Sequence, residues 1–366
     1  LNELTTTAAD HDALLAALQT AADNTAGVSL NGNTLTFTNG ASNLSFDIQG
    51  TDDTTFEGNE NFQILLQNPS SSTGITAELG NQTTVTTNVI DNDTLNFTLS
   101  GDTNVTEGQS ANFNIGFTGE LQQGEQASIT LNFDPLTTSA DDLEAITQAL
   151  QDTITALGPD SGISLDGTTL TFTGGGVNNL PFTIDTVNDA LFEGAEQFEL
   201  VLSNPTSTTG VTTTANTTPI TTTITDNDTL DFSITGSNTV AEGNTAAYTI
   251  TLAGGTLASG ESASVDIQLN DETTNAADHA ALLTAIQTAV DADNNVTLAG
   301  NTLTFSPGTT AFTFNLNALN DAFAEGNEQF NITLTNAQST TGVDTSISTA
   351  VATTTITDND AVNFVL

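Results

Sequence analysis

ITDNDTLDFSI (residues 224–234) places three carboxylates within six residues, where two short runs of alternating apolar and polar residues meet. Such alternation is typical of a β-strand that buries one face. The DND triplet in this stretch occurs at residues 91–93, 226–228 and 358–360, with spacings of 135 and 132 residues. We therefore interpret the stretch as the joint between two copies of a repeated β-rich unit.

Other segments repeat in step with the triplet. The segments DDTTFEGNENFQILLQN (52–68), NDALFEGAEQFELVLSN (188–204) and NDAFAEGNEQFNITLTN (320–336) align without gaps. VTEG (105–108) matches VAEG (240–243), but the first copy has no counterpart. The sequence predicts a partial unit at 1–93 that lacks its first strands, complete units at 94–228 and 229–360, and the first strand of a following unit at 361–366. This pattern indicates a section of a longer tandem array.

One complete unit gives the expected fold. In 94–228 the alternating runs are 94–100, 111–117, 127–133, 180–187, 196–203 and 219–225. The segment 139–154 departs from this period and places Leu143, Ile146, Leu150 and Ile154 on one helical stripe. Seven or eight strands with one inserted helix in about 133 residues predict an all-β Greek-key sandwich.

The composition restricts the possible partners. The 366 residues include 45 acidic side chains, two His and no Lys or Arg. Binding to nucleic-acid phosphates depends on Lys and Arg, so nucleic acid is excluded as a partner, and anionic membrane surfaces are disfavoured. No apolar run is long enough to predict insertion into a membrane. The chain has no Cys, which rules out disulfides and thiolate metal sites.

The acidic residues need cations from outside the chain. About three residues separate the last strand of one unit from the first strand of the next, so adjacent units nearly touch at the acidic seam. Two unit charges about 5 Å apart repel by roughly 0.8 kcal/mol in water, and by several times more in a partly buried site. Ca²⁺ takes six to eight oxygen ligands, whereas Zn²⁺ and copper prefer thiolate and imidazole ligands, and this chain has no Cys and only two His. We therefore expect Ca²⁺ between the carboxylates.

The motifs VxEG, GxTLTF, DD(x)3EGxExF and ITDND together resemble the Calx-beta domain. This is the calcium-binding β-sandwich of sodium–calcium exchangers, and it also occurs in tandem in very large bacterial surface and adhesion proteins. The resemblance implies tandem Ig-like (Calx-beta-like) sandwiches over nearly the whole chain. The helix looks like an insertion relative to the usual domain. Asn188, Asn320 and the central Asn of each DND replace carboxylates often found in the family, which implies fewer or weaker calcium sites.

The resemblance also implies calcium ligands in each unit. The partial first unit offers Asp10, Asp52, Asp53, Glu57, Asp91 and Asp93. The second offers Glu107, Asp142, Asp189, Glu193, Asp226 and Asp228. The third offers Glu242, Asp278, Asp321, Glu325, Asp358 and Asp360.

Several of these groups also have a structural interpretation. Asp142 and its equivalents stand three residues after Ser139, Thr7 and Asn275, the spacing of a helix capping box. Each DND can form a turn that bonds its own backbone. We interpret Glu60 and Glu196 as solvated residues at strand starts, and His11 and His279 as packing residues.

We predict no enzyme, because the same acids recur in every unit and no catalytic motif is present. The first hypothesis is a calcium-stiffened section of a secreted fibre, stalk or matrix filament at a bacterial surface, whose partners are calcium and the neighbouring repeats. The alternative is an adhesin whose units bind a carbohydrate or a surface directly. A third hypothesis is lateral or end-to-end assembly with other copies into a filament.

Overall fold

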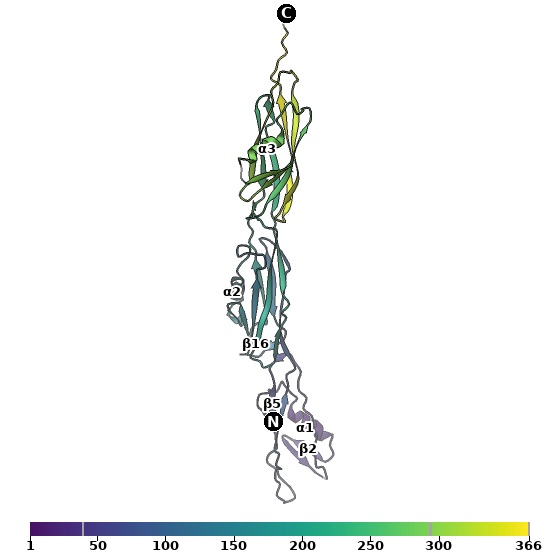
Figure 1. Ribbon diagram of the computed structural model, residues 1–366. Coiled ribbons are helices and arrows are strands. Elements are labelled where there is room, and N and C mark those ends of the chain that lie inside the picture. The colour runs from purple at the N-terminus through teal and green to yellow at the C-terminus, as the bar shows by residue number, and fades with distance from the viewer. Residues whose placement is uncertain (39, 293–294, 365–366) are drawn as a thin grey trace.

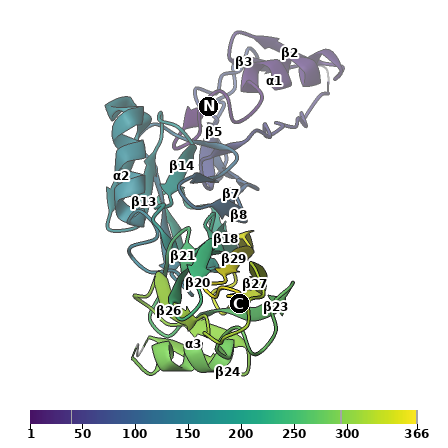
Figure 2. The ribbon, with the colours of Figure 1, turned by 90° about the horizontal axis from the view of Figure 1, so that it is seen from above.

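The computed structural model describes residues 1–38, 40–292 and 295–364. The units follow one another along an elongated rod (Figure 1). Seen along the rod, the helices α1 (Leu14–Asp23), α2 (Ile146–Leu157) and α3 (Leu282–Val290) project in different directions (Figure 2). Consecutive units are therefore rotated about the long axis. No described helix is both long and apolar enough to cross a membrane.

The second unit is a sandwich of two sheets. Its six-stranded sheet has the order β12 (Ile163–Asp166), β13 (Thr169–Thr173), β11 (Gln126–Asp134), β16 (Ala195–Ser207), β18 (Ile220–Thr225) and β8 (Asn104–Thr106). Its four-stranded sheet has the order β14 (Asn179–Asp185), β9 (Ser110–Gly116), β7 (Thr94–Gly101) and β17 (Thr212–Ala215). The alternating residues of both sheets meet in one core, where the rings of Phe97 and Phe117 pack edge to face at 5.3 Å.

The third unit repeats this plan. Its six-stranded sheet has the order β20 (Thr239–Ala241), β29 (Val351–Thr357), β27 (Glu328–Ser339), β23 (Ala263–Asp271), β25 (Thr302–Phe305) and β24 (Val296–Ala299). Its four-stranded sheet has the order β26 (Ala311–Asn317), β21 (Thr245–Ala253), β19 (Thr229–Gly236) and β28 (Asp344–Thr349). The predicted fold class, all-β tandem sandwiches with one inserted helix each, is confirmed.

The first unit is less complete. It contains a three-stranded sheet of β1 (Asn2–Glu3), β5 (Glu60–Leu65) and β6 (Thr84–Val89), and a hairpin of β2 (Val28–Asn31) and β3 (Thr34–Phe37). The counterpart of β14, residues 43–49, forms no strand. In the second unit β14 pairs with β9, and the described part of the first unit offers no strand equivalent to β9. Apolar side chains of the first sheet, such as Val85, consequently stay exposed.

The inserted helix begins later than its sequence predicts. The expected helix over 139–154 is observed as α2 from Ile146, because Leu143 forms a β-bridge with Thr186 and Ala145 is extended. Leu150 is fully buried on the predicted stripe. The same late start recurs before α1 and α3, where His11 and His279 form the equivalent bridges.

Each junction is built from a Phe-Glu-Gly segment. Strand β4 (Thr55–Phe56) pairs in parallel with β10 (Glu120–Leu121) of the second unit, and β15 (Leu191–Phe192) pairs in the same way with β22 (Thr256–Leu257) of the third. The rings of Phe56 and Phe192 are 2% and 0% exposed, and each belongs to the core of the unit that follows it. Neighbouring units are thus joined by packed side chains as well as by the chain.

The glycine of the segment is also part of the junction. Gly194 has φ +76°, and a Cβ built there would lie 2.1 Å from the carbonyl oxygen of Thr341 in the third unit. Gly58 has φ +69° and meets Thr209 of the second unit in the same manner, at 2.5 Å. Only glycine allows both this backbone conformation and this close approach.

The predicted unit boundaries at residues 93/94, 228/229 and 360/361 stay predictions. In the final segment, 361–364 form no strand, and 365–366 lie outside the described residues.

Candidate metal centre

Among the residues that the structure describes, carboxylates gather in five groups of three, and within each group one oxygen atom from each residue lies within 4.8 Å of the others. The first unit has one group, made of Asp10, Glu57 and Glu60. The second unit has two groups, Glu107–Asp189–Glu193 and Asp142–Glu193–Glu196. The third unit has Glu242–Asp358–Asp360 and Asp278–Glu325–Glu328. Because Glu193 belongs to both groups of the second unit, these groups form one continuous acidic site.

The first Asp of each DND holds the acidic loop in place. In the second unit, Oδ2 of Asp226 accepts hydrogen bonds from the backbone N–H groups of Glu193 (2.9 Å) and Gly194 (3.3 Å). Its Oδ1 accepts the N–H of Asp228 at 2.7 Å. Asp91 and Asp358 make the same three bonds in their units. The predicted DND turn is therefore present, and its first Asp also fixes the backbone of the loop Glu.

The central Asn of the triplet positions a second loop. Nδ2 of Asn227 donates to the carbonyl of Glu107 (3.1 Å) and to Oδ1 of Asn188 (2.5 Å). In the third unit Asn359 donates in the same way to Glu242 and Asn320. These Asn residues stand where the resemblance implies that carboxylates of the family are missing, and in each unit the two Asn side chains bond each other. They align the segment that carries Glu107 with the segment that carries Asp189.

Glu107 carries an unsatisfied charge. The residue is 7% exposed, and its Oε1 accepts the N–H of Asp189 at 3.1 Å. Its Oε2 is buried and has no hydrogen-bond partner. Burial raises its pKa, and the negative charges of Asp226, Asp189 and Asp228 raise it further. A buried carboxylate oxygen without a partner is costly, and a cation beside it would remove that cost.

Unpartnered oxygens recur at equivalent positions. Oε2 of Glu242, which corresponds to Glu107, is buried without a partner, and so is Oδ2 of Asp228 and of Asp360. In the first unit the same is true of Oδ1 of Asp10, which is 5% exposed. The unsatisfied acceptors of the second and third units therefore follow the repeat, whereas that of Asp10 has no counterpart at Asp142 or Asp278.

Several glutamates of the acid groups have a raised pKa. Burial raises the pKa of Glu193 to about 7 and of Glu196 to about 8, and the nearby charge of Asp142 adds to both shifts. Burial also raises the pKa of Glu60 and of Glu328 to about 7. Without a cation, several of these carboxyls are partly protonated at neutral pH, so an incoming metal ion must displace protons.

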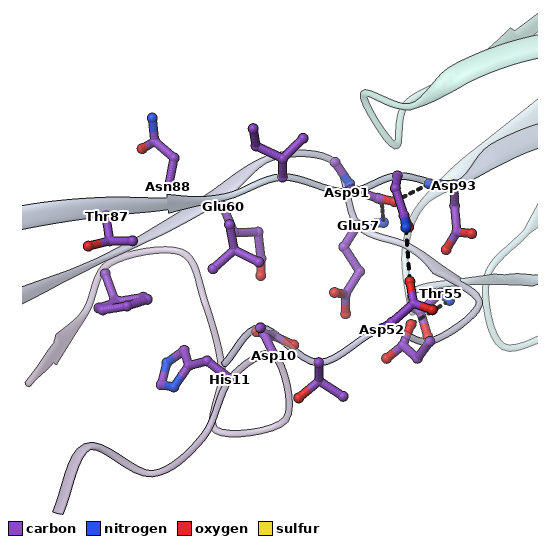
Figure 3. A pocket seen from close by; sticks show the side chains of 18 of the residues that line it. Asp10, His11, Asp52, Thr55, Glu57, Glu60, Thr87, Asn88, Asp91 and Asp93 are labelled. Atoms are coloured by element: carbon purple, nitrogen blue, oxygen red, sulfur yellow. Dashed lines mark hydrogen bonds between the residues drawn. The ribbon is translucent and has the colours of Figure 1, made fainter. Parts of the chain in front are cut away.

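The group of the first unit lines an open cavity of about 440 Å³. Figure 3 shows the carboxylates of Asp10, Glu57 and Glu60 converging from two segments, the loop that carries Asp10 and the stretch from Glu57 to Glu60 at the start of β5. The backbone N–H of Thr7 donates to Oδ2 of Asp10, as Ser139 and Asn275 do to Asp142 and Asp278. This bond is the one expected of a capping box, but the helix starts several residues later, at Leu14 in this unit. The capping interpretation of these Asp residues is wrong, because the bond closes a turn.

The two His residues lie against the clusters as packing groups. His11 is 4% exposed, and its ring lies 4.6 Å from that of Phe62. His279 lies 5.3 Å from Phe330, and its Nε2 is 2.8 Å from Oδ1 of Asp271. The hydrogen bond from His279 lowers the pKa of Asp271. The acid groups described above contain no His, so every candidate ligand in them is an oxygen.

The predicted ligands divide into two sets. Those brought into the acid groups are Asp10, Glu57, Glu107, Asp142, Asp189, Glu193, Glu242, Asp278, Glu325, Asp358 and Asp360. Those that lie outside the groups are Asp52, Asp53, Asp91, Asp93, Asp226, Asp228 and Asp321. Asp52 instead accepts a hydrogen bond from Asn92 at 2.9 Å. Whether any of these residues binds an ion stays a prediction.

Three members of the groups were not predicted as ligands. Glu60 and Glu196 were interpreted as solvated, but both are half-buried and join a group. Glu328 joins Asp278 and Glu325, although the sequence analysis assigns it no role. The signal was available, because an acid follows the loop Glu by three residues in all three repeats. Strand alternation predicts the face of the sheet from which such a side chain projects, but not which residues it contacts.

Comparison with known proteins agrees with the sequence pattern. The chain matches the family described as "Calx-beta domain" at residues 19–93, 149–228 and 255–360. The crystal structure of CBD12 from CALX1.2 is 16% identical, with 71% of this chain and 98% of that chain covered and a TM-score of 0.26. The calcium binding domain CBD12 of CALX1.1 is 13% identical, covering 70% and 98%, with a TM-score of 0.26.

The apo-form Calx CBD1 domain is 22% identical, covering 35% of this chain and 98% of that chain, with a TM-score of 0.25. These structural likenesses are too low to carry an argument of their own. The search of curated proteins gives no match. The family match, however, covers most of the chain in three copies. The chain therefore belongs to the Calx-beta domain family.

Proposed function

We propose that this chain is a calcium-binding structural section of a secreted bacterial surface fibre, stalk or matrix filament, in which Ca²⁺ stiffens the junctions between repeats. The observation that carries the proposal is the buried, unpartnered Oε2 of Glu107, a residue whose carboxylate groups with those of Asp189 and Glu193. A chain without Lys or Arg has no internal cation for this position. A bound ion would satisfy the oxygen and screen the repulsion within the group.

The donor set favours Ca²⁺. All members of the acid groups are carboxylates, and backbone carbonyls line the same loops. Such oxygen sets suit Ca²⁺, whose coordination tolerates irregular geometry, better than Mg²⁺, which demands a strict octahedron. Calx-beta domains are calcium-binding domains, which supports the same choice.

The mechanical role follows from where the acid groups lie. Glu193 stands between Phe192, whose ring is in the core of the third unit, and Gly194, whose backbone touches that unit. An ion that fixes Glu193 would therefore fix the segment that joins two repeats. Free calcium at 100 times the dissociation constant would add about 2.7 kcal/mol per site to the stability of the folded protein.

Scanning and titration calorimetry of the whole chain, with calcium or with a chelator, test the proposal. We expect calcium to raise the melting temperature and to bind with measurable heat. Glu107→Gln should weaken binding at the second unit, whereas Asp152→Asn, an equal charge change in the middle of α2, should not. An unchanged melting temperature together with no binding heat would refute the proposal.

The sole Tyr does not support the alternative of direct adhesion to a carbohydrate. Tyr248, the sole Tyr of a chain without Trp, is 1% exposed and bonds Thr354 through its hydroxyl (2.5 Å). It therefore provides no aromatic surface for a sugar.

A further inference from the structure

One strand that both complete units contain is missing from the described part of the first unit. In the second unit β7 pairs in parallel with β17, and in the third unit β19 pairs in the same way with β28. The counterpart of β17 in the first unit is residues 76–79, which follow Gly74 at φ +77° as β17 follows Gly210 at φ +78°. The structure assigns no strand to residues 76–79. Ile75 and Leu79 are exposed, whereas their equivalents in the second unit pack against its core.

The other end of the chain carries a segment of the missing kind. Residues 361–364, AVNF, follow the third DND as TLNF (94–97) and TLDF (229–232) follow the first two. The apolar residues of β7 and β19 at these positions are fully buried. Their equivalents Val362 and Phe364 are exposed, Phe364 to 95%, and 361–364 form no strand. An uncharged segment with the pattern of a first strand is therefore unpaired.

An exposed ring in the first unit matches the ring that this segment carries. Phe37, at the end of β3, is 45% exposed. In each complete unit the equivalent ring is fully buried and packs against the Phe of the first strand. The two pairs are Phe97–Phe172, with ring centroids 5.9 Å apart, and Phe232–Phe305, with centroids 5.4 Å apart. Phe37 thus lacks the partner to which Phe364 corresponds.

The site and the segment cannot meet within one molecule. The first unit and the C-terminus lie at opposite ends of the rod (Figure 1). A contact between them therefore joins two copies of the chain. Because the two copies use different surfaces, such a contact between straight rods repeats into an open filament.

We propose that residues 361–364 of one copy add a strand to the first unit of a second copy, pairing in parallel with residues 76–79 as β7 pairs with β17. Strand addition supplies backbone hydrogen bonds, and pockets for alternate side chains supply specificity. Here the alternate side chains are Val362 and Phe364, and Phe364 covers Phe37. The inference goes beyond the proposed calcium binding and does not depend on it.

The two complete units fix the register of the added strand. Thr214 lies opposite Asn96, and its Oγ1 donates to Oδ1 of Asn96 at 2.8 Å. The equivalent residues in the contact between copies are Glu78 and Asn363. The proposal therefore places Glu78 of one copy beside Asn363 of the other, on the outer face of the new sheet.

Disulfide trapping in the full chain tests this register. The chain has no Cys, so a disulfide between two introduced Cys residues reports that one contact. Glu78→Cys with Asn363→Cys is the test pair, and Asn33→Cys with Asn363→Cys is the control, because Asn33 is an exposed turn residue of the same unit. Under mild oxidation in chelator, the test pair should form a ladder of linked multimers about tenfold faster or more, since paired strands raise the effective thiol concentration. Adding Phe364→Ala to the test pair should remove this advantage.

Sedimentation of chains without introduced Cys gives an independent measurement. The net charge of −45 makes copies repel, so the runs use about 0.15 M salt, which screens charges beyond about 8 Å. The mean mass should rise between about 10 μM and 1 mM protein, because a contact of one short strand is smaller than a standard interface. Phe364→Ala and Phe37→Ala should each reduce this rise. Leu283→Ala, which truncates an exposed side chain on α3 away from both ends, should not.

The outcomes separate this inference from the proposed function. Equal rates of cross-linking in the test and control pairs would overturn the strand addition, and so would a mass unaffected by Phe364→Ala. A disulfide formed within single chains would overturn the contact between copies. Phe364 is almost fully exposed in the single chain, so its truncation leaves the fold intact even if Phe37→Ala does not. All of these results are obtained in chelator and leave the calorimetric test of calcium binding untouched.

Discussion

Replacing Phe192 by Ala should weaken the third unit, although Phe192 belongs to the sequence of the second. The ring is fully buried in the core of the third unit, next to Leu257 and Gly255. Truncation of a buried Phe to Ala costs about 3–5 kcal/mol. The free energy of unfolding of a domain is about 5–15 kcal/mol, so this loss is a large share of it.

The chain carries its own reporter for this experiment. Tyr248 is the sole Tyr, there is no Trp, and its ring is buried in the core of the third unit. Tyrosine fluorescence during urea unfolding therefore follows the third unit alone. With a denaturant slope of about 2 kcal/mol per M, the midpoint of Phe192→Ala should fall by about 1.5–2.5 M.

Two variants serve as controls. Phe56→Ala removes the equivalent ring from the core of the second unit. It should lower the urea midpoint of an unfolding transition followed by circular dichroism, and leave the midpoint followed by Tyr248 fluorescence unchanged. Phe323→Ala removes a ring that is 68% exposed and should cost less than about 0.5 kcal/mol. If Phe192→Ala and Phe323→Ala gave the same Tyr248 midpoint, the packing of one repeat into the next would not stabilise the rod.

Three further results are expected. In chelator, the free energy of unfolding should fall as the pH rises from about 5 to about 8. The reason is that burial raises the pKa of Glu193 to about 7 and of Glu196 to about 8, so that the folded protein retains protons that the unfolded chain has lost. Urea midpoints measured against pH test this, and saturating calcium should remove most of the pH dependence. Calcium binding at pH 7 should release protons, seen as a binding heat that depends on the buffer. Asp226→Asn should destabilise the second unit by about 1–3 kcal/mol even in chelator, because backbone N–H groups lose a carboxylate oxygen that accepts their hydrogen bonds. Glu107→Gln in chelator should be neutral or stabilising, because it removes a buried charge whose Oε2 has no partner. Equal losses of stability in both variants would contradict the assigned roles.

Much of the fold could be predicted, because the information is local. The six alternating runs predicted six strands of the second unit to within a few residues, and the repeat predicted the tandem order, but the short strands β8, β10, β15 and β17 were not predicted. The start of α2 was missed because residues 142–145 have helical periodicity but are held extended by the bridge from Leu143 to Thr186. That bridge depends on a partner distant in sequence.

The junction could not be predicted for a related reason. Alternation shows that Phe192 is buried, but not that the core covering it belongs to another repeat. The acidic loop was predicted from its motif, yet the motif stops at the unit boundary. Glu261 lies beyond it, in a turn whose sequence resembles any exposed Gly-Glu turn. Burial raises the pKa of Glu261 and the charge of Asp226 adds to that rise, a relation between two units that the sequence does not show.

The most direct test of calcium at the junctions is an anomalous difference map from crystals of this chain grown with calcium. The account predicts a peak among the carboxylates of Glu107, Asp189 and Glu193, with the loops around them closed on the ion. Water alone in that position, with the carboxylates turned apart at millimolar calcium, would contradict it.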